Sequence, residues 1–303
     1  MEKNIFEKEF KALGTDIYLQ IIASPAEALK IEKTFVFIED FYRKKELVFS
    51  RFNPDSELTK LNKKLKEFNR ASEDILYVAS VALDYYAKSE GIFDPRILAD
   101  LEDLGYKYNF TENEFKDKRF PLGSETSDLA QDLVVAGKEV KFSKKMDFNG
   151  IAKGYITDLV AKFLLKEGWQ DFLVDSGGDM YASGLNRHSE KWGIALEGTV
   201  DENEIFLEIS NKGIATSGNT RKCWEVGGRK FHHLINPKNK NEFSFDLKTV
   251  TVTAENTMKA DIWAKVLFIM GIEEGISFAK KNKINSIFLK NNQEVIKNDF
   301  ANL

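Results

Sequence analysis

The chain has 303 residues, of which 43% are hydrophobic and 12% aromatic, which is enough apolar material for a large core in one domain spanning residues 1–303. Its net charge of −4 and pI near 5.7 argue against a nucleic-acid-binding protein. The single cysteine, Cys223, excludes an intramolecular disulfide framework and a multi-cysteine metal site.

The first half of the chain shows strand and helix patterns in turn. Residues 10–22 are rich in β-formers and predict a strand. Ser24-Pro25-Ala26-Glu27 carries a capping-box pattern with proline at the first helical position, so a helix begins there. A second helix is predicted from Ser72 to Gly91, and residues 133–142 predict a hairpin.

The second half mixes helices and strands without strict βαβ alternation, which predicts an α+β fold. Apolar residues at helical spacing predict a helix from Gly154 to Gly168 and another over residues 260–270, which ends at Gly271 and is followed by a last helix. The predicted strands are residues 172–174, 192–196, 205–209, 231–235, 250–253 and 286–289.

The N-terminus opens with polar residues, so no secretory signal is visible, and no apolar run is long enough to span a bilayer. We therefore expect a cytoplasmic protein without a membrane span, although an exported chain from which the signal had been removed would look the same.

Residues 147–154 (Asp-Phe-Asn-Gly-Ile-Ala-Lys-Gly) stand directly before a predicted helix. Glycines allow a ligand to approach the backbone, a helix start offers free N–H groups to an anion, and Lys153 adds a positive charge. The spacing is not that of a Walker A loop. The segment is a candidate phosphate site, and a tight strand-to-helix turn is the alternative.

Two further segments combine glycine with small polar residues. Residues 175–179 (Asp-Ser-Gly-Gly-Asp) end a predicted strand, where consecutive glycines let a ligand press close or simply form a turn. Thr216 and Ser217 precede a glycine and suit polar contacts to phosphate or ribose. His232 and His233 follow, and histidine is the natural general base near neutral pH, with a surface histidine as the alternative.

The apolar helix over residues 260–270 contains only two charges, Asp261 and Lys265, which lie four residues apart on one face. They form either an exposed ion pair on a solvated stripe or a carboxylate held near a metal or phosphate by a rigid helix.

The wording and order of these segments resemble the FAD:protein FMN transferase family, also called the ApbE family. The matching segments are residues 12–15, 49–58, 61–62, 91–95, 150–154, 177–179, 215–218, 233–237 and 260–261, with Gly271.

The resemblance implies an α+β architecture of the T-fold type, with mixed sheets and packed helices. It implies Mg2+ as cofactor, FAD as substrate, and transfer of FMN to a Thr or Ser hydroxyl of an acceptor redox protein through a phosphoester bond, with release of AMP. Carried over by position, it implies metal ligands at the carbonyl of Ala152 and the carboxylate of Asp261, and His233 as base. Lys153 and Asp261 would complete the catalytic set. The implied FAD contacts are Gly14, Thr15, Phe52, Glu57, Asp94, Lys153, Gly177, Gly178, Thr216 and Ser217.

Three positions depart from the family pattern. Phe52 stands where Tyr is common, and Asn236 replaces the Asp of a His-x-x-Asp-Pro motif. Lys265 stands where the family usually has Thr or Ser, four residues after the metal-binding Asp261.

The lysine allows two arrangements. Either it points into solvent and Mg2+ binds with one protein ligand fewer, or its ammonium group takes the metal position. We expect the first, because lysine is long enough to reach solvent and Mg2+ needs few protein ligands. The alternative functions are a flavin-binding protein without transfer activity and a pyrophosphatase that splits FAD into FMN and AMP.

Overall fold

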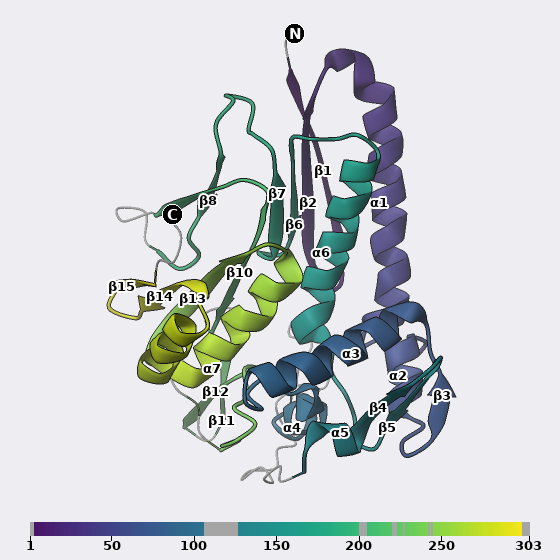
Figure 1. The fold of residues 1–303 in the computed structure, drawn as a ribbon, viewed down its shortest axis with the longest axis vertical. Coiled ribbons are helices and arrows are strands. Elements are labelled where there is room, and N and C mark those ends of the chain that lie inside the picture. The colour runs from purple at the N-terminus through teal and green to yellow at the C-terminus, as the bar shows by residue number, and fades with distance from the viewer. Residues whose placement is uncertain are drawn as a thin grey trace.

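An eight-stranded sheet forms the centre of the computed structural model, which describes residues 3–105, 127–199, 205–219, 223–226, 228–241, 243 and 245–298 (Figure 1). Each strand is antiparallel to its neighbours, and the spatial order follows the chain order. The strands, in that order, are β1 (Asn4–Ala12), β2 (Thr15–Ala23), β6 (Phe172–Ser176), β7 (Met180–Ser183), β10 (Lys212–Gly218), β13 (Leu247–Ala254), β14 (Asn285–Lys290) and β15 (Val295–Asn298).

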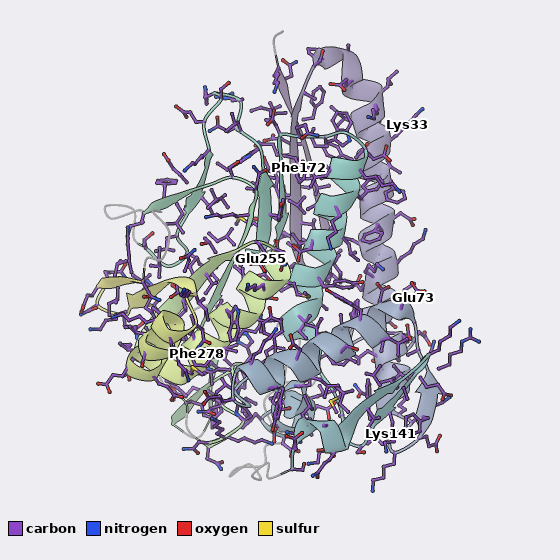
Figure 2. The ribbon with its side chains drawn as sticks, in the orientation of Figure 1. Lys33, Glu73, Lys141, Phe172, Glu255 and Phe278 are labelled. Carbon is purple, nitrogen blue, oxygen red and sulfur yellow. The ribbon has the colours of Figure 1, made fainter. Side chains whose placement is uncertain are left out.

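Three long helices, α1 (Ala28–Phe49), α6 (Asn149–Lys166) and α7 (Thr257–Lys281), pack against one face of this sheet (Figure 1). The main hydrophobic core lies between these helices and the sheet and includes Phe172, which is fully buried (Figure 2). The hairpin of β8 (Trp192–Ala195) and β9 (Phe206–Ile209) packs on the other face. Because successive side chains of a strand point to opposite faces, Ile214 belongs to the hairpin side and Ala215 to the helix side. The α+β prediction is confirmed.

The smaller elements lie below the main sheet in Figure 1. They include a three-stranded sheet in the order β3-β5-β4 and a two-stranded hairpin of β11 and β12. No helix in the described part of the chain could cross a membrane. The bounds are η1 (Pro25–Glu27), α2 (Glu57–Asn62), β3 (Phe68–Arg70), α3 (Glu73–Lys88), η2 (Pro95–Ile97), α4 (Leu98–Asp103), α5 (Leu129–Asp132), β4 (Leu133–Ala136), β5 (Glu139–Phe142), β11 (Cys223–Val226) and β12 (Arg229–His232).

Several local predictions are confirmed. Ser24 and Glu27 form the capping box, and the side chain of Ser72 caps α3. The predicted 133–142 hairpin is β4 and β5. Gly271 interrupts α7 with a φ of 76°, after which the helix resumes. Only glycine adopts a backbone conformation with such a positive φ easily, which is why the helix breaks at this position.

Three boundaries differ from the predictions. The single strand over residues 10–22 is wrong, because a turn at Leu13 and Gly14 divides this region into the antiparallel strands β1 and β2. The strand over residues 231–235 ends at His232. The third difference is β10, which was not predicted as a strand and pairs with β7 and β13 inside the main sheet.

The start of α6 also differs from the prediction. The helix begins at Asn149 and contains Gly154, so this glycine does not form a turn before it. A Cβ atom at Gly154 would lie 2.6 Å from the Cα of Met258 in α7. The glycine therefore allows the two helix backbones to approach each other closely.

The N-terminus of α7 is fixed by α6. The carboxylate of Asp158 accepts the backbone N–H groups of Thr257 and Met258, at 2.7 and 2.9 Å. The side chain of Asn256 accepts the N–H of Lys259 at 2.8 Å. These three bonds satisfy donors that a helix start otherwise leaves free, and they set the position of the helix that carries Asp261.

Candidate active site

A cavity of about 500 Å³ is lined by residues of α1, α6, α7 and β10 and of several connecting segments. Volumes of this size are common for small-molecule and cofactor sites. Eleven of the thirteen residues predicted to have a catalytic, FAD-binding or metal-binding role line it, namely Gly14, Thr15, Phe52, Asp94, Ala152, Lys153, Gly177, Thr216, Ser217, His233 and Asp261. The fold thus brings together segments that are far apart in the chain.

Glu57 and Gly178 do not line this cavity. The carboxylate of Glu57 accepts the backbone N–H of Ser72 at 2.6 Å, so it ties α2 to the start of α3. Glu57 is therefore a structural residue in this conformation and makes no direct contact with the cavity.

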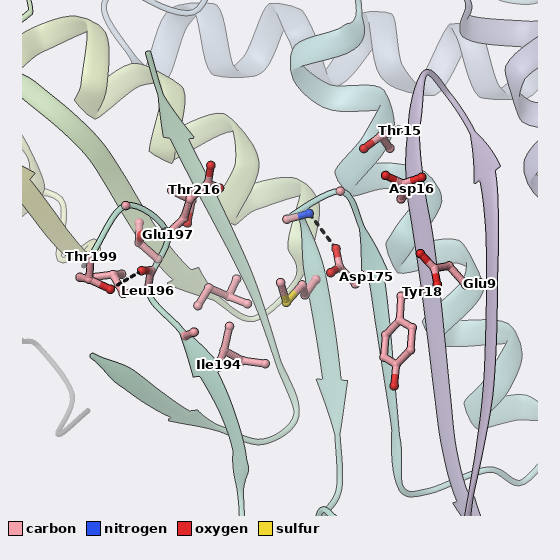
Figure 3. Close-up of a pocket in the computed structure, with 17 residues that line it drawn as sticks. Glu9, Thr15, Asp16, Tyr18, Asp175, Ile194, Leu196, Glu197, Thr199 and Thr216 are labelled. Carbon is pink, nitrogen blue, oxygen red and sulfur yellow. Dashed lines mark hydrogen bonds between the residues drawn. The ribbon is translucent and has the colours of Figure 1, made fainter. Parts of the chain in front are cut away.

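Gly178 lines a second pocket of about 570 Å³, where its N–H donates to Asp175 at 2.7 Å (Figure 3). Thr15, Gly177, Glu197 and Thr216 line both pockets, so the two adjoin. The second pocket is lined by four carboxylates, Glu9, Asp16, Asp175 and Glu197, and by no lysine or arginine of the described residues. We therefore expect phosphate groups to bind in the first cavity.

Two ion pairs hold the two lysines of the first cavity, which is also lined by Arg51 and by the carboxylates of Glu46, Asp94, Asp147 and Glu197. Nζ of Lys153 lies 2.5 Å from Oδ2 of Asp179, and Nζ of Lys265 contacts Oδ1 of Asp261. Both carboxylates are almost fully buried, with 2% and 1% of Asp179 and Asp261 exposed. The four side chains come from α6, α7 and the turn that follows β6, and together they carry no net charge.

The electrostatics of the two pairs favour charged lysines. Burial disfavours the charged form of Lys153, but Asp179 and Asp261 outweigh it and raise the pKa of this lysine. Burial, reinforced by the negative charge of Asp179, raises the pKa of Asp261 to about 6, although Lys265 and Lys153 oppose the shift. Oδ2 of Asp261 is buried and accepts no hydrogen bond from the residues that the structure describes. The carboxylate therefore depends on nearby positive charge to remain ionised.

The orientation predicted for Lys265 is wrong. Its side chain is only 18% exposed and turns toward Asp261, and the alternative of an exposed pair on a solvated stripe is equally wrong. Gly150 makes room for this conformation, because a Cβ atom there would lie 3.4 Å from Cδ of the lysine and 3.3 Å from the ring of Phe93. Burial of Asp261 on the α6 side of the helix provides the driving force for pairing, which the sequence pattern alone did not reveal.

Apolar side chains form much of the cavity wall. Phe52 is 39% exposed, and the guanidinium carbon of Arg51 lies over its ring, 4.4 Å from the ring centroid. Arg51 is a cavity residue that the sequence analysis did not single out as a binding residue, and its Nε lies 3.5 Å from Asp147. The apolar residues of this wall are Leu13, Phe49, Phe52, Ile92, Phe93, Ile97, Leu101, Leu234, Ile235, Val266 and Ile269.

Asp94 lines the cavity but its carboxylate is already engaged. Both oxygens accept from the guanidinium group of Arg96, at 2.7 to 3.1 Å, and one also accepts the backbone N–H of Arg96. Arg96 in turn reaches Asp132 at 2.7 Å. This buried network of charged side chains fixes the loop that follows Gly91. Asp94 could therefore contact a ligand only through a carboxylate lone pair that Arg96 does not use or through its backbone.

The two neighbouring histidines have different surroundings. His232 is 3% exposed and packs edge-on against Phe243, Phe245 and Phe268, so it belongs to the protein interior. His233 is half-buried and lines the cavity. Only His233 is placed to reach a ligand there.

The nearby Asn236 keeps the local turn despite replacing an aspartate. Its side-chain oxygen accepts the N–H of Lys238 at 3.0 Å, a bond that a carboxylate oxygen would also accept. The substitution therefore leaves the loop after β12 tied down.

The cavity combines apolar lining residues with two half-buried lysines on two helices, a combination that suits a nucleotide bearing a large ring. The model of the ApbE family matches residues 13–288, and the chain belongs to this family. The FAD:protein FMN transferase of Haemophilus influenzae is 26% identical over 297 residues, which cover 93% of this chain and 86% of the relative. The FAD:protein FMN transferase of Vibrio cholerae is 30% identical over 245 residues, which cover 78% of this chain and 72% of the relative.

Solved structures show the same fold. The apo form of the flavinyl transferase ApbE of Pseudomonas stutzeri superposes with a TM-score of 0.83 at 23% identity, over 98% of this chain and 95% of that one. The ApbE protein of Thermotoga maritima gives a TM-score of 0.83 at 20% identity, over 98% and 97%. The predicted T-fold-like architecture is confirmed.

Proposed function

We propose that this chain is an FAD:protein FMN transferase, which moves FMN from FAD to a Thr or Ser hydroxyl of an acceptor redox protein. Membership of the ApbE family and the names of its relatives support the activity. The observation that carries the proposal is the single cavity in which an apolar wall adjoins two lysines, since FAD combines a flat ring with a pyrophosphate.

The reaction requires one bond to form and one to break. The acceptor oxygen bonds to the phosphorus of the FMN half, the bond from that phosphorus to the bridging oxygen breaks, and AMP leaves with the electron pair. The hydroxyl proton must go to a base. Catalysis of such a step depends on positioning and on neutralising charge at the phosphates.

Each role has a candidate in the cavity. Lys153 lies on the rigid helix α6, and its raised pKa keeps it positively charged toward the phosphates. His233 lines the cavity and is the candidate base for the acceptor hydroxyl. Thr216 and Ser217, near the end of β10, line the cavity and are candidates for polar contacts to the ligand, although the Thr216 hydroxyl already shares a hydrogen bond with that of Thr251 at 2.9 Å.

The predicted Mg2+ site fits these residues poorly. One oxygen of Asp261 is paired with Lys265, and the carbonyl of Ala152 lies within α6, where the helical hydrogen-bond ladder uses it. The described residues contain no cluster of three His, Cys, Asp or Glu side chains that could bind a metal. A divalent ion about 4 Å from an ammonium group is repelled by roughly 8 kcal/mol at the effective dielectric of a protein site. Mg2+ dependence, which the family resemblance implies, is therefore left out of the proposed reaction.

The experiment that tests the proposal is incubation of the chain with FAD and a candidate acceptor protein, followed by intact-mass measurement. A mass increase equal to FMN minus water on the acceptor, together with stoichiometric AMP, supports transfer. FMN and AMP released in solution without modified acceptor would indicate the pyrophosphatase instead. Tight FAD binding without either product would indicate a flavin-binding protein.

A further inference from the structure

The site contains a positive charge that the family pattern does not have. Lys265 stands where the family usually has Thr or Ser, and its ammonium group contacts Asp261 inside the cavity. The ion pair belongs to the site and does not lie on the surface, because the side chain of Asp261 is 1% exposed and that of Lys265 is 18% exposed.

The surroundings hold the lysine in this position. Gly150 lies beside its methylene groups, and a Cβ atom there would be in van der Waals contact with Cδ and Cε of the lysine at 3.4 and 3.5 Å. Val266 and Ile269, on the same helix, are apolar members of the cavity wall. A carboxylate as buried as Asp261 needs a partner charge, and Lys265 is four residues away on a helix whose start is fixed by Asp158.

The charge count changes what the cavity can accept. Lys153, Lys265, Asp179 and Asp261 sum to zero among themselves, and Arg51, Glu46, Asp94, Asp147 and Glu197 also line the cavity. The pyrophosphate of FAD would meet the two ammonium groups already in place. With Thr or Ser at position 265 the same group would carry one negative charge, and an anionic ligand would then require an added cation.

We propose that the ammonium group of Lys265 supplies the positive charge at Asp261 that a divalent metal would otherwise supply, so that this chain binds FAD without a divalent metal. The inference rests on the proposed function for its ligand and concerns the same site. In the transfer step Lys265 stabilises the negative charge that develops on AMP as the bond to the bridging oxygen breaks, and it neither gives nor accepts a proton.

The test compares FAD affinity in excess EDTA and in millimolar Mg2+, measured by quenching of flavin fluorescence. The wild-type protein is expected to bind FAD equally in both buffers, within about twofold. Lys265→Thr is expected to bind at least tenfold more weakly in EDTA and to regain affinity when Mg2+ is added. Calorimetry of Mg2+ into the FAD complex should show binding for the variant and none for the wild type.

The control is Lys259→Thr on the same helix. Lys259 also forms an i,i+4 pair, with Glu255 at 2.9 Å, but that pair is exposed and outside the cavity. The control should behave as the wild type in both buffers. Lys265→Arg keeps the charge and should keep metal-independent binding, which provides the comparison if Lys265→Thr fails to fold.

Wild-type FAD affinity that falls tenfold or more in EDTA, or Mg2+ binding to the wild-type complex, would overturn the inference. Neither result bears on transfer. Conversely, FAD bound equally in both buffers but never transferred to any acceptor would refute the proposed function and leave the inference standing.

Discussion

Replacement of Asp158 by alanine is expected to destabilise the protein by about 2–4 kcal/mol. The carboxylate accepts two buried N–H groups at the start of α7, and each one left without an acceptor costs about 1–3 kcal/mol. Part of this cost is offset, because burial raises the pKa of Asp158 despite the two N–H groups, which shows that the charge itself is held at a desolvation cost.

The assay is urea unfolding at pH 7, with FAD affinity as a second measurement. Asp158→Ala should lower the midpoint with an unchanged slope, and it should weaken FAD binding, because Asp261 lies on the first turns of the same helix. Asp158→Asn keeps one acceptor oxygen and should lose about half as much stability. A change below about 0.5 kcal/mol in the alanine variant would show that water or the cap at Asn256 satisfies these donors, and the reasoning would be refuted.

Three further predictions follow from other contacts. Gly154→Ala should lower the free energy of unfolding, measured in urea, by about 1–3 kcal/mol, because the added methyl group would meet the backbone of Met258. This overpacking outweighs the helix preference of alanine over glycine, which is about 1 kcal/mol. A more stable variant would contradict the close contact between the two helices. His233→Ala should slow single-turnover FMN transfer by about 10²–10⁴ with FAD affinity unchanged, and a wild-type rate would exclude it as the base. Burial would raise the pKa of Asp132, but hydrogen bonds from Arg96, Ser127 and Lys144 outweigh it and lower the pKa. The ionised carboxylate therefore stabilises the folded state above its unfolded pKa of about 3.9, and this stabilisation is lost as the pH falls through the lower folded pKa. Asp132→Asn should therefore be less stable than wild type at pH 7, with the gap closing below about pH 4, and a gap that does not change with pH would contradict this assignment.

Local signals in the sequence were sufficient for much of the fold. Helix starts at Ser24 and Ser72 were predictable because a capping side chain bonds the backbone next to it, and the break at Gly271 because few other residues adopt its φ. Such features need no knowledge of the rest of the molecule.

Features that depend on distant neighbours were not predictable in the same way. The Thr-Ser-Gly segment of β10 was not predicted as a strand, and its pairing with β13 makes it one. Gly154 resembled a turn residue until α7 was placed beside it. The direction of Lys265 follows from the burial of Asp261, which is set by the packing of α6 against α7.

The candidate site was located mainly by resemblance, since its residues are dispersed along the chain. Arg51 was not recognised as a cavity residue, because it is a single arginine beside a phenylalanine in a polar stretch. The roles proposed for Lys153, His233 and Asp261 stay predictions until the variants are measured.

The order of the strands bears on how the protein emerges from the ribosome. Because spatial order in the main sheet follows chain order, each new strand can add to an edge that has already been made, up to β10 and β13. The flavin cavity cannot form so early, since its wall runs from Leu13 to Ile269 and the helix with Asp261 is among the last elements to be synthesised. A nascent chain that stops after β13 would therefore carry most of the sheet and still be unable to hold FAD, which confines flavin binding to nearly complete molecules.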